Sequence, residues 1–504
     1  NALGSLAEVA GSALYKRLSV IINSIIETLI NIDPKNSDKP EILNSLTRII
    51  LSVKDGEGLH PLLQQILSLV KNEDIAKRAV ILKVLPKFFD ETVLNYSTYT
   101  SDFLQHLILS LDDDDSEIVK DSLASLTTLV KKQDKSYLEE LVKPAKQSLD
   151  LTGNANSEIA GFKLMKGPAS ILPIFLQGLM YGNNEQRELS AMGITALVSK
   201  TPSANLKMYV TQIVGPLIRV VGERFNSEIK AAILSSLNIL FVKVPQFLRP
   251  FVPQLQRTFV RGLGDLSNPL LRERAAVGLG LLIQYQPKVD PLVSELVNNS
   301  KNSEDIGVKT AMLKGLMEVI SKVGMKLNES SKKQVINLVE DELNNEDKSL
   351  NIAYARLIGS VSEILTEEEA DNILQDKVYK FADVGEESEE HDGKITYPET
   401  ALEFACLAIN AFLKNSPRHV FRSQEDFGDF IVKMNDQAKY VQVSDYALSA
   451  IGKALLLIGE SKSPYTTLAE DDNTETFNLS DEVLSKLVDQ LIKNLIIPAS
   501  NSND

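Results

Sequence analysis

Residues 206–221 read LKMYVTQIVGPLIRVV, and after the short break GERFN the chain continues at 227–240 with SEIKAAILSSLNIL. Apolar residues in the first run are spaced by four, three, four and four positions, which is the spacing of one helical face. The second run carries the same kind of stripe. The stretch therefore predicts two amphipathic helices joined by a polar turn. The two apolar faces are Leu206, Val210, Ile213, Leu217 and Val221, then Ile229, Ile233, Leu237, Leu240 and Val244.

The same unit restarts about 40 residues later, from Leu248 through the break GDLSN at 264–268 into the run PLLRERAAVGLGLLI at 269–283. Similar pairs recur along the rest of the chain, and no alternating β pattern is long enough to compete with them. One pair is too thin to bury its own apolar face, so neighbouring pairs must stack. We predict an all-α fold, a HEAT-repeat α-solenoid built as a superhelix of antiparallel helix pairs.

The chain shows no obvious domain boundary. Its 504 residues contain no linker rich in Gly, Ser or Pro, so we expect one continuous array over residues 1–504. It begins at Asn1 without Met and stops at Asp504 after a helix that has no partner, so we expect a fragment of a longer solenoid. Six acidic residues lie between Asp383 and Asp392, and we expect residues 383–397 to form a disordered acidic insert.

Composition excludes several classes of protein. A formal charge of −15 argues against a chain whose whole surface binds nucleic acid or an anionic membrane. Cys406 is the only cysteine, which excludes a disulfide framework or a thiolate metal cluster and fits a reducing, cytoplasmic compartment. No apolar run approaches 18 residues, so we predict no membrane contact.

Candidate catalytic residues are few. The four histidines are scattered, without the spacing of a metal site or a catalytic triad. The sequence VGLGLL at 277–282 resembles half a dinucleotide fingerprint, but no strand precedes it. The acidic run Asp112–Asp115 lacks the spacing of a calcium loop and is better explained as a solvated turn. We therefore predict no enzyme activity, no cofactor and no metal. The histidines are His60, His106, His391 and His419.

One region is basic. Residues 200–290, here called the basic island, carry twelve Lys or Arg against five Asp or Glu, a net charge of +7 that leaves −22 for the remainder. Some of these cations occupy one place in successive second helices, just after the turn. There they are expected to pair with an acidic turn residue of a neighbouring repeat. These expected ladder residues are Lys120, Lys230, Arg274 and Lys309, of which the first and last lie outside the island.

Other arginines fall on the exposed side of the first helices. Arg219 and Arg257 each stand two positions beyond an apolar residue, Arg261 follows Arg257 by one turn, and Arg224 lies in the break. Exposed arginine suits bidentate contacts with carboxylates and is enriched at binding hot spots. A recognition role and a purely architectural role both remain open here. The candidate protein-binding residues are Arg219, Arg224, Arg249, Arg257 and Arg261.

Four segments are more specific than a generic repeat. They are GPLIRVVGERF at 215–225, LRPFVPQLQRTF at 248–259, KVDPL at 288–292 and GVKTAML at 307–313. With them, the chain resembles the C-terminal third of the general-control translational activator family, the giant HEAT-repeat activators of the translation initiation factor 2 alpha kinase. The resemblance is strongest from about Gly167 to Leu374.

The resemblance implies a cytoplasmic, ribosome-associated scaffold whose residues 167–374 bind the N-terminal RWD domain of that kinase. It also implies that uncharged tRNA on translating ribosomes is thereby signalled to the kinase, and that other RWD-domain proteins are candidate partners. Arg219 and Arg224 stand in the family's RWD-binding segment; Arg249 and Arg257 join them by spacing alone. The alternative is a nuclear transport receptor, which is also acidic and HEAT-built and should bind the GTPase Ran.

Overall fold

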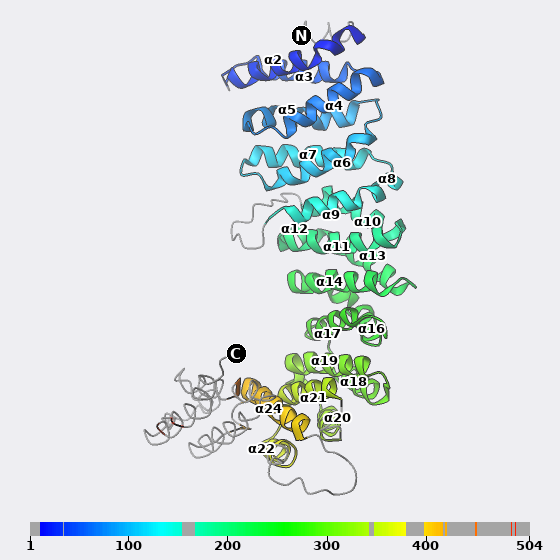
Figure 1. Ribbon diagram of the computed structural model, residues 1–504, viewed down its shortest axis with the longest axis vertical. Helices are drawn as coiled ribbons and strands as arrows, with labels where there is room; N and C mark the ends of the chain where they lie inside the picture. The colour runs from blue at the N-terminus through cyan, green and yellow to red at the C-terminus, as the bar shows by residue number, and fades with distance from the viewer. Residues whose placement is uncertain are drawn as a thin grey trace, which may run out of the picture. The chain divides into compact units, whose positions relative to one another are not determined.

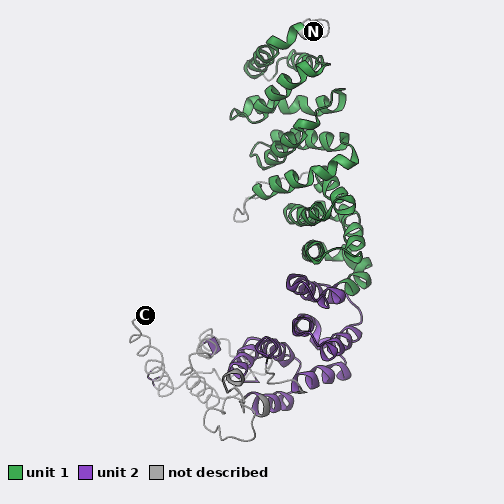
Figure 2. Cartoon of the chain, turned by 45° about the vertical axis from the view of Figure 1, so that its right-hand side comes forward, with its two compact units in different colours: residues 1–258 green, residues 259–504 purple. Residues whose placement is uncertain are grey.

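The computed structural model describes residues 11–33, 35–153, 167–341, 347–379 and 398–416, together with 419–420, 449–450, 485 and 489. The chain divides into two compact units, residues 1–258 and 259–504 (Figure 2). All regular structure in the described residues is helical. In each unit, antiparallel helix pairs stack on one another as a HEAT-repeat solenoid, as predicted (Figure 1).

The first unit runs from η1 to α16, and the boundary between units falls inside α16, after Thr258. Its elements are η1 (Gly11–Arg17), α2 (Leu18–Asn31), α3 (Lys39–Leu51), α4 (Gly56–Val70), α5 (Ile75–Glu91), α6 (Ser97–Leu109), η2 (Ser110–Asp112), α7 (Ser116–Lys132), α8 (Lys135–Glu140), α9 (Val142–Leu151), η3 (Gly167–Ser170), α10 (Leu172–Tyr181), α11 (Asn184–Lys200), α12 (Ser203–Leu206), η4 (Lys207–Tyr209), α13 (Val210–Gly222), α14 (Ser227–Lys243), α15 (Pro245–Leu248), η5 (Arg249–Phe251) and α16 (Val252–Leu263).

The second unit continues the same pattern of paired helices. Its elements are α17 (Pro269–Ile283), α18 (Asp290–Asn302), α19 (Ile306–Val323), η6 (Gly324–Lys326), α20 (Glu329–Asp341), α21 (Lys348–Ser362), α22 (Glu367–Asn372), the π-helical stretch η7 (Ile373–Tyr379) and α24 (Pro398–Asn415).

Burial confirms the predicted helical faces. All five apolar positions of the run 206–221 are buried, and so are all five from Ile229 to Val244. These stripes make the core because each faces the partner helix of its own pair or the next pair along the chain. The second helices α11 and α14 approach closely enough for the Ser236 hydroxyl to donate to the Ala191 carbonyl oxygen at 3.0 Å. Ser236 therefore marks a close approach of these two second helices.

The polar turns are fixed by capping. Asp or Asn precedes most second helices, and its side chain accepts hydrogen bonds from the free amides of the first helical turn, as Asp115 does from Glu117 and Ile118. The acidic run Asp112–Asp115 is accordingly engaged by the protein itself. Asp112 accepts a hydrogen bond from the amide of Gly153 at 2.9 Å, and Asp113 binds Arg78. This run is a set of turn and cap residues, and not simply a solvated turn.

Some boundaries differ from the predicted ones. The helix expected from Leu206 is divided into α12, η4 and α13, and the second copy is divided in the same way into α15, η5 and α16. Pro250 lies inside η5, whereas the corresponding turn η4 of the first copy contains no proline. A helix expected over 366–378 is the short α22 followed by η7. The acidic insert 383–397 and the helices expected at 157–165, 424–434, 443–459 and 479–497 lie wholly or almost wholly outside the described residues.

Candidate functional site

The candidate arginines occupy three kinds of position. Arg219 lies in the last turn of α13, Arg224 in the turn that follows, Arg249 begins η5, and Arg257 lies in α16. All four belong to the first unit and are exposed. Arg261 also lies in α16 and is exposed, but it belongs to the second unit. Exposure is the first requirement for a recognition role, and for Arg219, Arg257 and Arg261 it agrees with the side of the helix predicted from spacing.

Local packing explains why Arg219 points outward. Leu217, Val220 and Val221 around it are buried, so Arg219 is left on the solvent side of α13 with 68% of its side chain exposed. Its Nε lies 3.6 Å from Oε1 of Glu223, one turn later. A single long contact between two exposed groups constrains the guanidinium little, and leaves it available to a partner carboxylate.

The structure does not gather all the arginines at one place. Arg219 and Arg224 lie together at the C-terminal end of a first helix and in its turn, whereas Arg249 precedes the corresponding helix of the next repeat. Arg249 therefore sits at the opposite end of its repeat from the turn. Within the first unit, the turn cluster of Arg219 and Arg224 is the densest group of predicted site residues.

The expected ladder residues were partly wrong. In these second helices, the backbone amide four residues after the N-cap donates to the carbonyl oxygen of the cap residue. Among the expected ladder residues, only Lys230 and Lys309 occupy this position. Lys120 lies one residue later and pairs with Glu117 of its own helix at 3.6 Å. Arg274 lies two residues after Arg272, which holds the equivalent position. The place just after the turn therefore predicted the ladder position only to within one or two residues.

Arg78 shows what the ladder position does. Its Nη1 donates to the carbonyl oxygen of Asn72 at 2.8 Å in its own turn, and its Nη2 donates to Oδ2 of Asp113 at 2.7 Å in the next turn. One guanidinium thus satisfies a carbonyl of one repeat and a carboxylate of the next. Only 18% of each side chain is exposed.

The same position recurs in both units. Arg187 donates from Nη1 to the carbonyl oxygen of Leu179 at 2.6 Å, and its Cζ lies 4.3 Å from the ring centroid of Phe225 in the next turn. Arg272 donates from Nη1 to the carbonyl oxygen of Asp265 at 2.7 Å and lies against Gly307 of the following turn. The motif that would have revealed them is an Asp or Asn cap with Arg four residues later.

A second set of cations was missed in the sequence. Lys243, the last residue of α14, donates to the carbonyl oxygens of Val198 and Thr201, each at 2.9 Å, at the end of α11. Lys200 contacts the carbonyl oxygen of Thr152, and Lys132 that of Asp90, in the same way. Burial lowers the pKa of Lys243 and of Lys200. Part of the positive charge of the basic island is therefore structural.

The histidines form no catalytic arrangement in the described residues. His60 contacts the hydroxyl of Tyr99, burial lowers the pKa of His106, and His419 is buried. His391 lies outside the described residues. No group of three His, Cys, Asp or Glu side chains in the described part of the chain could hold a metal ion. None of the helices described is long and apolar enough to cross a bilayer.

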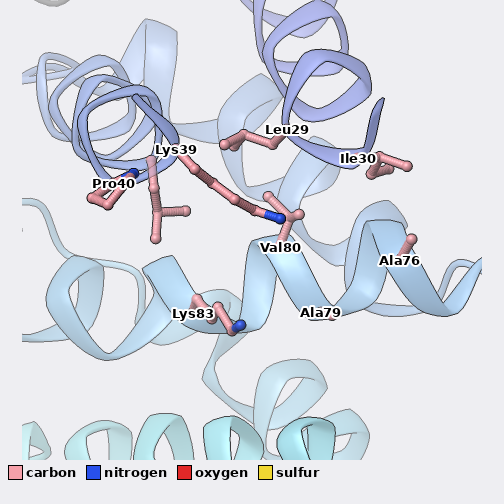
Figure 3. A pocket seen from close by; sticks show the side chains of 9 residues that line it. Leu29, Ile30, Lys39, Pro40, Ala76, Ala79, Val80 and Lys83 are labelled. Carbon is pink, nitrogen blue, oxygen red and sulfur yellow. The ribbon is translucent and has the colours of Figure 1, made fainter. Parts of the chain in front are cut away.

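A pocket of about 410 Å³ lies between α2, α3 and α5 in the first unit, away from the basic island (Figure 3). Lys39 extends across it toward Val80, and Lys83 rises from α5 on another side. Most of its lining is partly exposed, so it is an open gap between repeats more than an enclosed ligand site. The lining residues are Leu29, Ile30, Lys39, Pro40, Leu43, Ala76, Ala79, Val80 and Lys83.

Comparison with known proteins places this arrangement in a family. Two sequence profiles, each described as "Stalled ribosome sensor GCN1-like, HEAT repeats", match residues 1–166 and 290–463. The eIF-2-alpha kinase activator GCN1 of Saccharomyces cerevisiae is 53% identical over 506 residues, which cover 100% of this chain. The chain belongs to the GCN1-like HEAT-repeat family. Membership of this family favours a kinase-activating scaffold over a nuclear transport receptor, the alternative that the sequence left open.

Other GCN1 relatives are more distant. The human stalled ribosome sensor GCN1 is 32% identical over 376 residues, or 74% of this chain. The chain spans only 18% of the yeast relative and 14% of the human one. Among solved structures, importin beta aligns with a TM-score of 0.47 and 13% identity over 98% of this chain and 65% of that chain. A Kap95:Nup1 complex aligns with a TM-score of 0.48 and 14% identity, over 98% of this chain and 62% of that chain. Similarity at this level says nothing about the partners of this GCN1-like chain.

Proposed function

We propose that this chain is the kinase-docking part of a GCN1-type activator. In this proposal, a surface within residues 167–374 binds the N-terminal RWD domain of the translation initiation factor 2 alpha kinase. The scaffold thereby promotes activation of the kinase by uncharged tRNA on translating ribosomes in the cytoplasm. It performs no chemistry, and it reaches the ribosome through the full-length protein. Other RWD-domain proteins are expected to compete for the same surface.

The observation that carries the proposal is the set of exposed arginines on a strongly acidic GCN1-like chain. Lys200, Lys243 and Arg272 are committed to contacts within the array, whereas Arg219 is 68% exposed and held by one long contact to Glu223. Arg224 and Arg257 are also exposed. An exposed guanidinium is able to bind carboxylates of a partner in bidentate geometry.

The names of the relatives support a kinase as the partner. The yeast relative is named a kinase activator and the human relative a stalled ribosome sensor. Since this chain corresponds to under a fifth of either protein, its share of that work is narrower than the whole. Binding of one folded domain is a task that a stack of repeats can perform alone, because each repeat adds to one extended surface.

The deciding experiment is calorimetric titration of the 504-residue chain with the purified RWD domain of the kinase. We expect saturable binding that weakens as salt rises, because charge pairs contribute to association. A parallel titration with the GTPase Ran in its GTP form tests the transport-receptor alternative. Binding of Ran together with no binding of the RWD domain would overturn the proposal.

A further inference from the structure

We infer that the partner docks on a strip of aromatic and arginine side chains along the turn edge of two neighbouring repeats. The strip consists of Tyr181, Arg187, Arg224 and Phe225, and it adjoins Arg219. This inference rests on the proposed function and deepens it. It names residues that the sequence argument did not select, and it states the chemistry of the surface that fits them.

The four residues lie together because one guanidinium joins their two turns. Arg187 donates to the carbonyl oxygen of Leu179, two residues before Tyr181, which ends α10. The Cζ of Arg187 lies 4.3 Å from the ring centroid of Phe225, the neighbour of Arg224 in the next turn. All of these residues belong to the first unit. The strip is thus a contiguous feature of one compact body.

The strip has the composition of a binding hot spot. Tyr181 is 65% exposed although a tyrosine at a helix end could readily pack inward, Phe225 is only partly buried, and Arg224 is exposed. Tyrosine and arginine are the residue types most enriched at the energetic centre of interfaces. The exposed ring of Tyr181 and the accessible part of Phe225 represent apolar area which a partner is able to cover.

The first of the two turns is held in place before any partner arrives. Asn183 and Gln186 form a reciprocal capping box with both hydrogen bonds at 2.9 Å, and the Gln186 amide also donates to the carbonyl oxygen of Glu139 at 3.2 Å. A Cβ on Gly182 would lie 2.6 Å from the carbonyl oxygen of Gly178, so only glycine fits there. Little ordering entropy is lost when a preformed surface binds, which favours affinity.

The chemistry of the strip selects a partner of opposite character. The exposed guanidinium groups of Arg219 and Arg224 offer donors and positive charge, and Arg187 lies over the Phe225 ring beside them. Oε1 of Glu223 lies 3.6 Å from Nε of Arg219. The fitting surface is an apolar patch about the size of two side chains, rimmed by carboxylates, on a folded acidic domain. We assign that surface to the RWD domain proposed above.

Single substitutions test the assignment in the full 504-residue chain. Tyr181→Ala removes an exposed ring, so we expect an unchanged melting temperature and RWD affinity reduced about 10-fold or more. Phe225→Leu keeps apolar bulk and removes the ring under Arg187, and should also weaken binding. Met208→Ala is the matched control, because Met208 is 80% exposed in the same region but lies at the other end of the first helix from the turn.

Three outcomes contradict the inference in distinguishable ways. If Arg219→Glu abolishes RWD binding while Tyr181→Ala and Phe225→Leu bind like the parent chain, the strip is repeat architecture alone and the proposed function stands. If the parent chain does not bind the RWD domain at all, the proposed function and this inference fail together. Equal losses for Tyr181→Ala and Met208→Ala would show a general effect of lost apolar surface, which also overturns the assignment.

Discussion

The guanidinium of Arg78 and the carboxylate of Asp113 are joined at 2.7 Å across two successive repeat turns, with 18% of each side chain exposed. Arg78→Ala removes the guanidinium that donates to the carbonyl oxygen of Asn72 and to Oδ2 of Asp113. We expect the free energy of unfolding to fall by about 2 kcal/mol, because the groups left behind are partly buried. Urea unfolding followed by circular dichroism measures this change in the free energy of unfolding. Lys120→Ala, which removes an exposed contact to Glu117, should change stability by less than about 0.5 kcal/mol.

Charge reversal should separate recognition from architecture. Arg219→Glu places like charge against an acidic partner while removing only an exposed contact, so we expect weaker RWD binding by about 2 kcal/mol and an unchanged melting temperature. Lys243→Ala should instead lower the melting temperature without a selective loss of RWD binding. It leaves carbonyl oxygens at the end of α11 without a donor. Calorimetry and thermal melting on both variants give the comparison. A fall in stability for Arg219→Glu without selective loss of binding would assign Arg219 to the fold.

Two glycines should respond oppositely to alanine. A Cβ on Gly359 would lie 2.9 Å from the carbonyl oxygen of Ala411, where α21 packs against α24, so Gly359→Ala should lower stability by about 1–3 kcal/mol. Gly215 lies inside α13 with no atom within 4 Å of an added Cβ. Gly215→Ala should therefore raise stability by up to about 1 kcal/mol through helix propensity. Equal shifts for both variants in denaturant unfolding would contradict the close packing at Gly359.

The single cysteine reports on the opening of α24. Burial raises the pKa of the Cys406 thiol to about 12. The folded pKa lies above the unfolded value of about 8.5, so the thiol's contribution to stability is complete below that value and is lost as pH rises toward 12. We expect no reaction with a maleimide at pH 8 until denaturant opens the second unit. Rapid labelling of the native chain at pH 8 would contradict this burial, and Cys406→Ala supplies the blank.

The helical pairs and their buried faces were predictable because an apolar stripe at helical spacing is a local property of the sequence. Leu217 and Ile229 are buried as that spacing required. The inter-repeat contacts were harder to predict. Lys120 and Arg274 were expected because they lie just after a turn, whereas Arg78, Arg187 and Arg272 lie four places after the cap residue. Partners in another repeat depend on stacking geometry, which the sequence of one repeat does not contain. Arg219, Arg257 and Arg261 were found because exposure, like burial, follows from the helical period.

The lysines at the ends of second helices determine where such a chain is safely shortened. Lys243 closes the carbonyl end of α11 and Lys200 that of α9, so at these places a later helix completes an earlier one. A fragment that stops between Thr201 and Lys243 would expose a frayed final turn on α11, although all residues of that helix are retained. Fragment boundaries for crystallisation or interaction mapping are thus better placed after a complete following repeat than at the last residue of the segment of interest.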